Sequence, residues 1–300
     1  MKMAFHKLAE YLLKCLPAIA ALLFILLPSL PAFAESLEVK LPSGITVFAD
    51  YHGGLPAMPA ILLLHGFQQT YQSEPMSSLG SNLAAKGYTV LRPTISLGVN
   101  KRKQSMACEA VHTHTYKEEV AEIAYWMNWL GNKGFKTIVP AGFSSTGNVG
   151  LLIYNAQGAH PAVKKIILIS PNPQFFDLAE RKSIRAGLNK NQHANSQKLG
   201  AFTLGYCKNN YFSTPNNYYS YTQYDESIVA GLMKQSPVPL EIILGSADTI
   251  LPPAWLAQLK AIKSPTRITT IDQANHFFAD SAEFELTEAV ENIIKNINVQ

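Results

Sequence analysis

The sequence predicts an α/β protein with a mostly parallel central sheet and helices on both faces, and three observations support this. Short, nearly continuous apolar runs alternate with segments of helical periodicity, as expected for strands buried on both sides. The first two strand patterns flank a tight turn, which adds an antiparallel edge. The chain has 300 residues, 47% of them hydrophobic, which is enough for one large domain with a substantial core.

Each expected element follows from its local pattern. Alternating apolar residues at 36–41 and 45–51 flank Pro-Ser-Gly and predict a hairpin. Buried strands are expected at residues 59–66, 88–93, 137–142, 164–170, 240–248 and 267–272. Helices are expected at residues 76–87, 115–134, 145–158, 253–262 and 282–297. The second helix has the clearest signal, because Thr115 and Glu118 have the spacing of a capping box before a strongly amphipathic run.

A polar insertion at about residues 172–238 interrupts this alternation between the sixth and seventh strands. It is rich in Asn and Gln and holds six tyrosines, at positions 206, 211, 218, 219, 221 and 224. We expect it to form a cap over the carboxyl edge of the sheet, where open α/β sheets bind ligands. Most of the tyrosines are expected to hold this cap together, with one or two reaching a pocket.

Residues 1–34 have the layout of a secretory signal peptide. A basic start is followed by an uncharged apolar run, and Ala32 and Ala34 have the A-x-A spacing of a cleavage site. An uncleaved membrane anchor is the alternative, because the apolar run is nearly long enough to span a bilayer. The prolines near its end and the small residues favour cleavage. We therefore expect residues 35–300 to form an α/β domain that is periplasmic or secreted.

The charge balance restricts the class of partner. The formal net charge is +4, and about +2 remains without residues 1–34. Such a near-neutral balance argues against a nucleic acid or an anionic membrane as partner. We expect a small-molecule partner and no stable membrane association after the signal peptide is removed.

Cys108 and Cys207 are the two cysteines that remain after cleavage. An oxidising compartment would let them pair, so we expect a disulfide, with two unrelated thiols as the alternative. Cys108, His112 and His114 also suggest a metal site, but no carboxylate completes a set of ligands. We therefore expect no metal there.

The stretch GFSSTGN, residues 142–148, joins an expected strand to an expected helix. A serine on such a turn projects its hydroxyl above the sheet, and the helix N-terminus behind it offers N–H groups to a developing oxyanion. Gly142 stands two residues before Ser144, as the G-x-S-x-G pattern requires, whereas Ser145 has Phe143 there. The alternative is that these hydroxyl residues only cap a helix.

Three further positions support the interpretation that Ser144 lies on such a turn as a nucleophile and is not a helix cap. His-Gly-Phe at 65–67 ends an early strand, so the backbone N–H groups of Phe67 and Ser145 are candidate oxyanion donors. Asp248 and His276 follow two later strands. Because parallel strands end at one edge of a sheet, we expect Ser144, Asp248 and His276 to converge there.

These motifs together resemble the α/β-hydrolase superfamily. The matching segments are HGF, GFSSTG, GSADTILP and ANHFF, in the family's order, over roughly residues 36–298. The resemblance implies Ser144 as nucleophile, His276 as base and Asp248 as the acid that orients the imidazole. Thr146 stands where the family pattern has glycine, which puts the local geometry of the turn in question. The last two segments are similar to the serine-aminopeptidase and carboxylesterase branches without separating them.

The expected function is therefore that of an exported serine hydrolase that cleaves a carboxylic ester through an acyl-enzyme, with no metal or organic cofactor. Alternatives are an aminopeptidase-like amide hydrolase, an acyltransferase and a catalytically inactive ligand-binding homologue. Asp177, after the sixth strand, is the second candidate for the acid, and His65 is expected to be structural.

Overall fold

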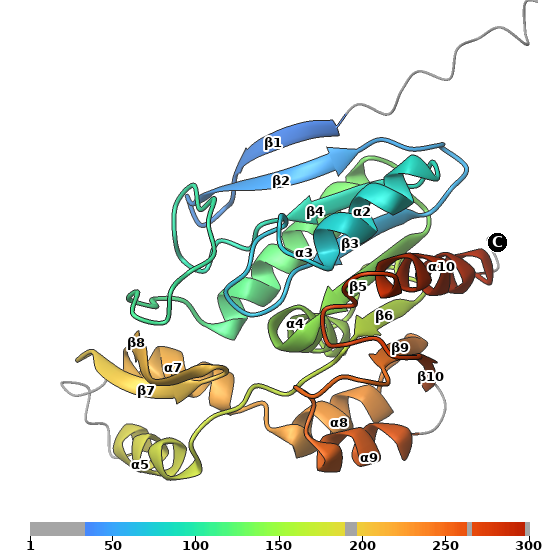
Figure 1. The fold of residues 1–300 in the computed structure, drawn as a ribbon. Helices are drawn as coiled ribbons and strands as arrows, with labels where there is room; N and C mark the ends of the chain where they lie inside the picture. The colour runs from blue at the N-terminus through green and yellow to red at the C-terminus, as the bar shows by residue number, and fades with distance from the viewer. Residues whose placement is uncertain (1–33, 190–196, 263–265, 298–300) are drawn as a thin grey trace, which may run out of the picture. The chain divides into compact units, whose positions relative to one another are not determined.

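A computed structural model describes residues 34–189, 197–262 and 266–297 (Figure 1). The expected signal peptide lies outside the described residues except for Ala34, at which the first strand begins. The main sheet has eight strands in the order β1-β2-β4-β3-β5-β6-β9-β10. Its strands are β1 (Ala34–Lys40), β2 (Thr46–His52), β3 (Ala60–Leu64), β4 (Thr89–Pro93), β5 (Ile138–Phe143), β6 (Ile166–Ile169), β9 (Leu240–Gly245) and β10 (Thr266–Ile271). Only β2 runs against its neighbours β1 and β4, so the prediction of a mostly parallel sheet with an antiparallel edge is confirmed.

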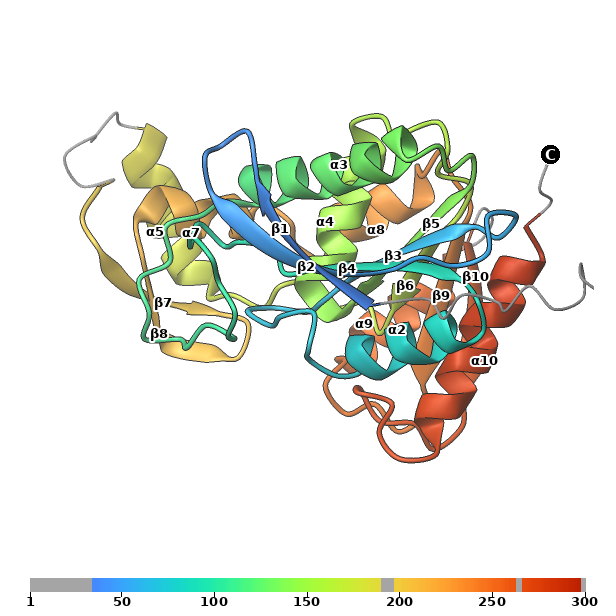
Figure 2. The same cartoon turned by 90° about the horizontal axis from the view of Figure 1, so that it is seen from above.

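Helices cover both faces of the sheet (Figure 2). The apolar side chains of α2 (Met76–Ala85) and α10 (Ala282–Lys295) join one core cluster, on one face. The other face is covered by α3 (Tyr116–Asn132), α4 (Ser144–Ala156), α8 (Glu226–Lys234) and α9 (Pro253–Lys260). The capping box predicted for the helix that is α3 is confirmed, because the Thr115 side chain accepts from the Glu118 N–H and the Glu118 carboxylate accepts from the Thr115 N–H.

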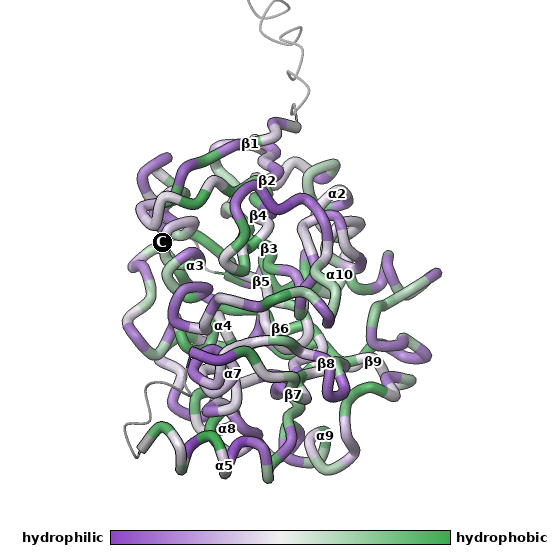
Figure 3. The backbone as a smooth tube through the Cα atoms, turned by 90° about the vertical axis from the view of Figure 1, so that its left-hand side faces the viewer, coloured by the Kyte–Doolittle hydropathy of each residue, from purple (hydrophilic) through white to green (hydrophobic). Residues whose placement is uncertain are grey.

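The strands are apolar on both sides, which explains why the sequence shows them as continuous runs. In β3, Ile61 and Leu63 face the cluster with α2 and α10, while Leu62 and Leu64 face the other cluster. All five residues of β3 are buried. Figure 3 shows the hydrophobic segments running through the central strands, with hydrophilic segments in the outer turns.

The insertion between β6 and β9 forms a small subdomain and one further helix. Its elements are α5 (Leu178–Asn189), β7 (Gly200–Leu204), β8 (Cys207–Ser213), α7 (Pro215–Thr222) and α8. The first four lie together at the lower left of Figure 1, and we call them the cap. In contrast, α8 packs against α4, and its Val229, Ala230 and Met233 belong to the main core. Residues 172–238, expected to form only a cap, thus contain both the cap and one helix, α8, that packs on the main sheet.

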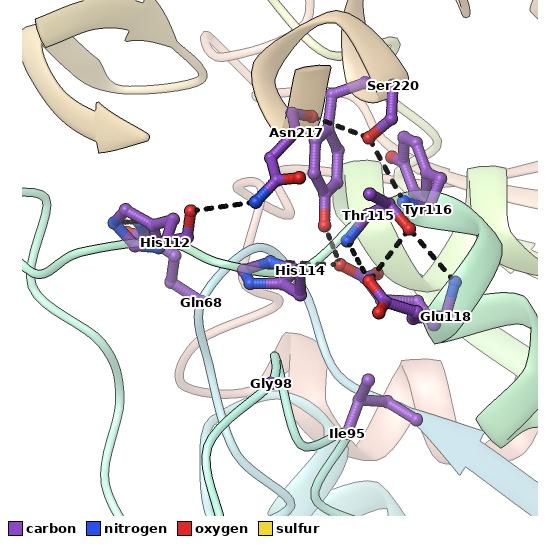
Figure 4. Close-up of polar contacts among 12 residues, drawn as sticks. Gln68, Ile95, Gly98, His112, His114, Thr115, Tyr116, Glu118, Asn217 and Ser220 are labelled. Carbon is purple, nitrogen blue, oxygen red and sulfur yellow. Dashed lines mark hydrogen bonds and ion pairs between the residues drawn. The ribbon is translucent and has the colours of Figure 1, made fainter. Parts of the chain in front are cut away.

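The segment 107–118 connects the cap to the main sheet. Asn217 of α7 donates to the His112 carbonyl at 3.4 Å, and the Tyr116 N–H donates to Ser220 Oγ at 3.3 Å (Figure 4). The structure also joins Cys108 of this segment to Cys207 of β8 by a disulfide, with the Cα atoms 5.4 Å apart. None of the helices in the described part of the chain has the length and apolar character needed to cross a membrane.

Candidate active site

The turn from β5 into α4 places Ser144 at the carboxyl edge of the sheet. Ser144 has a φ of 55°, in the left-handed region that a serine adopts on a sharp strand-to-helix turn. Two glycines allow the helix to approach the sheet closely. A Cβ on Gly142 would lie 2.6 Å from the Gly147 carbonyl carbon, and one on Gly147 would lie 2.7 Å from the Leu64 carbonyl oxygen. Any larger residue at either position would require the backbone to shift.

Thr146 departs from the G-x-S-x-G pattern, and the structure shows how the turn accommodates it. Thr146 is buried in the first turn of α4. The close approach to the strand occurs one residue later, at Gly147. The departure therefore moves the required glycine by one position and leaves the sharp turn at Ser144 intact.

Ser144, His276 and Asp248 form a chain of hydrogen bonds. Ser144 Oγ lies 2.9 Å from His276 Nε2, and His276 Nδ1 lies 2.7 Å from Asp248 Oδ2. The carboxylate is the acceptor of the Nδ1–H, which leaves Nε2 to accept from the serine hydroxyl. The structure thus brings together the three side chains that the sequence predicts would converge.

The turn after β9 fixes the Asp248 carboxylate. Its Oδ1 accepts from the Ile250 N–H at 2.8 Å and the Leu251 N–H at 3.2 Å, while Oδ2 accepts from His276. Burial raises the pKa of this carboxyl, but the hydrogen bonds from His276 and the two N–H groups outweigh burial, and the pKa lies below its usual value. Asp248 is therefore held as a carboxylate in one orientation.

The loop that carries His276 is tied to the turn after β9. The Ala247 N–H donates to the Ala274 carbonyl at 3.0 Å, and Ser246 Oγ accepts from the Gln273 N–H at 2.7 Å. Asn275 Oδ1 accepts from the Phe277 N–H at 2.9 Å and closes the turn around the histidine. These bonds join the turn that carries Asp248 to the loop that carries His276, in addition to the direct contact between the two side chains.

The His-Gly-Phe turn lies directly opposite the serine. A Cβ on Gly66 would lie 3.4 Å from Ser144 Cβ, and Phe67 and Ser145 line the same pocket. The Ser145 N–H is in the first helical turn, where no intrahelical acceptor is present. Phe67 and Ser145, whose N–H groups are the predicted oxyanion donors, thus line the pocket together with Ser144.

A buried histidine and a buried arginine hold this turn. His65 Nδ1 donates to the Gly66 carbonyl at 2.9 Å, and its Nε2 accepts from the Ile95 N–H at 3.1 Å. Burial, with a smaller effect of Arg102, lowers the pKa of His65 to about 3, so the ring is neutral. Arg102 donates to the Gln69 carbonyl at 2.8 Å. His65 therefore has the structural role expected for it.

A pocket of about 1040 Å³ opens between this edge of the sheet and the cap. Ser144 and His276 lie in its wall together with Phe67 and Phe143. Further lining comes from the segment between β6 and α5, including Phe175, and from the β7–β8 hairpin of the cap, including Tyr206. Ser144 is thus accessible to a ligand bound beneath the cap.

Three residues that support the site were not singled out from the sequence. Asn148 donates from Nδ2 to the carbonyls of Ser144, at 2.6 Å, and Ile169, at 2.8 Å. Gln68 is buried with a φ of 60°, accepts from the Tyr206 hydroxyl at 2.7 Å, and follows the candidate donor Phe67. Arg102, described above, is the third. Asn148 lies within GFSSTGN, so an amide in the first turns of that helix was a usable signal.

Asp177, the second candidate for the acid, and His112, of the suggested metal site, make other contacts. Asp177 Oδ1 accepts from the Ala179 and Glu180 N–H groups at the start of α5. His112 stacks on Tyr211 at 4.0 Å between ring centroids, and its Nε2 lies 3.3 Å from the Cys108 carbonyl. Within the described ranges, no three His, Cys, Asp or Glu side chains gather as a metal-binding group.

Comparisons with known proteins support the same fold. No protein-family model matches the sequence, and no curated protein does. Est1E from Butyrivibrio proteoclasticus aligns with a TM-score of 0.59 at 19% identity, covering 87% of this chain and 97% of that chain. The α/β hydrolase GrgF from Penicillium sp. sh18 aligns with a TM-score of 0.65 at 14% identity, over 88% and 98%. An esterase from Pyrococcus furiosus aligns with a TM-score of 0.58 at 13% identity, over 88% and 91%. Together with the strand order and the turn at Ser144, these matches show that the chain has the α/β-hydrolase fold.

Proposed function

We propose that this protein is an exported serine hydrolase that cleaves a carboxylic ester through an acyl-enzyme. The observation that carries the proposal is the hydrogen-bonded chain Ser144–His276–Asp248 at the wall of an accessible pocket. Ser144 is the nucleophile, His276 the general base and Asp248 the group that orients the imidazole. The names of the structural neighbours, which include an esterase, support hydrolysis as the class of reaction.

In the first half of the reaction, Ser144 Oγ attacks the ester carbonyl carbon and its proton passes to His276 Nε2. Asp248 stabilises the resulting imidazolium through the Nδ1–H. The N–H groups of Phe67 and Ser145 donate to the oxyanion that forms. When the tetrahedral intermediate collapses, the alcohol leaves with the proton from Nε2, and the acyl group stays on Ser144.

In the second half, a water molecule replaces the alcohol. His276 Nε2 takes a proton from the water as its oxygen attacks the acyl carbon, and then returns the proton to Ser144 Oγ. The acid product leaves, and the site returns to its starting state. No metal or organic cofactor takes part in this scheme.

Export is part of the proposal. The pairing of Cys108 with Cys207 supports an oxidising compartment, which is where disulfides persist. If the full chain is expressed in a bacterium with a periplasm, we expect the exported protein to begin at Glu35. A mature protein that retains residues 1–34 would support a membrane anchor instead.

The activity is tested with the purified protein, residues 35–300, on p-nitrophenyl esters and on aminoacyl p-nitroanilides. We expect ester hydrolysis that Ser144→Ala abolishes and Ser145→Ala retains, because only Ser144 contacts the imidazole. Hydrolysis of the anilides alone would indicate an aminopeptidase. No turnover of either class by folded protein would contradict the proposal.

A further inference from the structure

The mouth of the pocket is lined by large apolar side chains that are exposed to water. They are Phe175, Leu178, Tyr206, Ile250 and Phe277, with exposed fractions of 63%, 71%, 63%, 48% and 42%. We call these five residues the apolar rim. Soluble proteins rarely gather exposed apolar groups in one place unless the patch binds something apolar. The rim is therefore a candidate for contact with the substrate.

The rim faces the reacting atoms from two sides. Phe175, Leu178 and Tyr206 come from the region between β6 and β9, whereas Ile250 and Phe277 stand beside the candidate acid and base in sequence. A ligand whose carbonyl lies at Ser144 therefore has apolar surface on both sides on its way out of the pocket. The rim continues the apolar inner wall, which includes Phe67, Phe143 and Phe176.

The polar groups of the pocket do not favour a charged ligand. Its charged lining residues are Lys208, Asp225 and Glu226, which are of both signs. The Asp225 carboxylate is already engaged, since Oδ2 pairs with Arg181 at 3.0 Å and Oδ1 accepts from the Ile228 N–H at 3.1 Å. The lining thus has no concentration of one charge that would recognise an ionic group.

The size of the pocket also favours a large ligand. Its volume of about 1040 Å³ is at the upper end of the range of ~300–1,000 Å³ that is common for drug-sized ligands. A short-chain ester would fill only a small part of it and would leave the rim exposed. Each methylene that leaves water for such a wall contributes about 0.8 kcal/mol, which corresponds to about fourfold in affinity.

We infer that the substrate of this site is an uncharged ester with an aliphatic chain of about eight or more carbons, held along the apolar rim. The inference rests on the proposed function for the chemistry at Ser144, but the rim itself is independent of that chemistry. A short-chain ester then reacts at Ser144 but does not reach the apolar rim.

The kinetic test compares p-nitrophenyl butanoate with p-nitrophenyl decanoate, below the concentration at which the longer ester forms micelles. We expect kcat/KM to be at least about tenfold higher for the decanoate, which allows for incomplete burial at the rim. Phe175→Ser and Leu178→Ser should lower kcat/KM for the decanoate by about fivefold or more and change it for the butanoate by less than about twofold. Phe284→Ser is the matched control, because Phe284 is 66% exposed on α10 and does not line the pocket.

A binding test separates this inference from the proposed function. The Ser144→Ala protein is titrated with 2-hexanone and 2-dodecanone, which resemble short and long esters but are not cleaved. We expect tighter binding of the longer ketone, weakened by Phe175→Ser and unchanged by Phe284→Ser. A protein that binds the long ketone in this way but cleaves no ester would retain the inference and lose the proposed function. Equal binding of both ketones, equal turnover of both esters, or equal effects of the rim and control variants would overturn the inference.

Discussion

At the scale of single residues, the candidate site depends on backbone positions that few residue types can occupy and on polar groups that make several hydrogen bonds. Ser144 adopts a left-handed backbone because the chain must turn from β5 into α4 within one residue. Gly147 lies against β3 so closely that a methyl group would meet a carbonyl oxygen. Asp248 uses both carboxylate oxygens, one for the turn and one for His276.

Gly147→Ala should destabilise the protein by about 1–3 kcal/mol, because its Cβ would lie 2.7 Å from the Leu64 carbonyl oxygen and 2.9 Å from that of His65. The free energy of unfolding in urea measures this. Gly187→Ala in α5 is the control, since its Cβ would meet nothing within 4 Å, and we expect equal or slightly higher stability there. Equal stability of Gly147→Ala and the wild type would contradict the close approach at the turn.

Asp248→Asn should lower kcat by roughly 10³–10⁴-fold with little change in KM, because an amide in this position favours the wrong histidine tautomer. Steady-state kinetics on a p-nitrophenyl ester give both constants. Asp272→Asn is the control, since that exposed side chain accepts from the Ser246 hydroxyl and an amide oxygen can do the same. A loss below about tenfold for Asp248→Asn would assign the acid to another residue.

At the scale of elements, the cap is attached to the main sheet through α3 and the segment before it. Tyr221 of α7 donates its hydroxyl to the buried Glu119 carboxyl of α3, and the Tyr221 ring packs against Tyr116 at 4.3 Å between centroids. The disulfide adds a covalent link beside Gln68, whose side chain contacts Tyr206 and Cys207. The position of the cap and the position of the His-Gly-Phe turn are therefore connected.

Replacing both cysteines, Cys108→Ser with Cys207→Ser, should lower the free energy of unfolding by about 2–5 kcal/mol, because the link closes a loop between residues 99 apart. Urea denaturation with and without dithiothreitol measures this. The reductant should bring the wild type to the midpoint of the double variant and leave that variant unchanged. Identical midpoints for the oxidised wild type and the double variant would show that the link adds nothing to stability.

Glu119 should make stability depend on pH. Burial raises its pKa to about 8, against 4.5 for the ordinary group, and the buried Glu122 shifts in the same direction to about 7. Between pH 4.5 and 8 the unfolded chain ionises Glu119 while the folded protein keeps it protonated. The contribution of Glu119 to the free energy of unfolding is thus fully present below about pH 4.5 and is lost as the pH rises towards 8.

Glu119→Gln should reduce this dependence, because the amide can still accept from Tyr221 and does not ionise. We expect the fall in Tm from pH 5 to pH 8 to be smaller in the variant by at least about 2–4 °C, which corresponds to ~1 kcal/mol for a domain of this size. Thermal melts at pH 5, 6.5 and 8 give the values, and Glu285→Gln on the exposed side of α10 should follow the wild type. Parallel curves for wild type and Glu119→Gln would contradict a protonated Glu119.

At the scale of the whole molecule, the sequence predicts what depends on local pattern. Strands buried on both faces appear as apolar runs, and the turns after β3, β5, β9 and β10 appear as short motifs, so the fold and the convergence of Ser144, Asp248 and His276 could be expected. The interior of the cap could not, because β7 (Gly200–Leu204) has only five residues and β8 (Cys207–Ser213) has the polar run Lys208–Asn210 at its centre. The supporting roles of Gln68 and Arg102 arise from contacts with segments far along the chain, which local periodicity does not encode.

The central claim is that Ser144 is an activated nucleophile, and covalent labelling tests it most directly. Residues 35–300, folded and oxidised, would be treated with a fluorophosphonate, and the modified peptide would be identified by mass spectrometry. We predict one adduct, on Ser144, that is lost in Ser144→Ala, kept in Ser145→Ala and greatly slowed in His276→Ala. An adduct on another serine, or no adduct on folded protein, would contradict the claim.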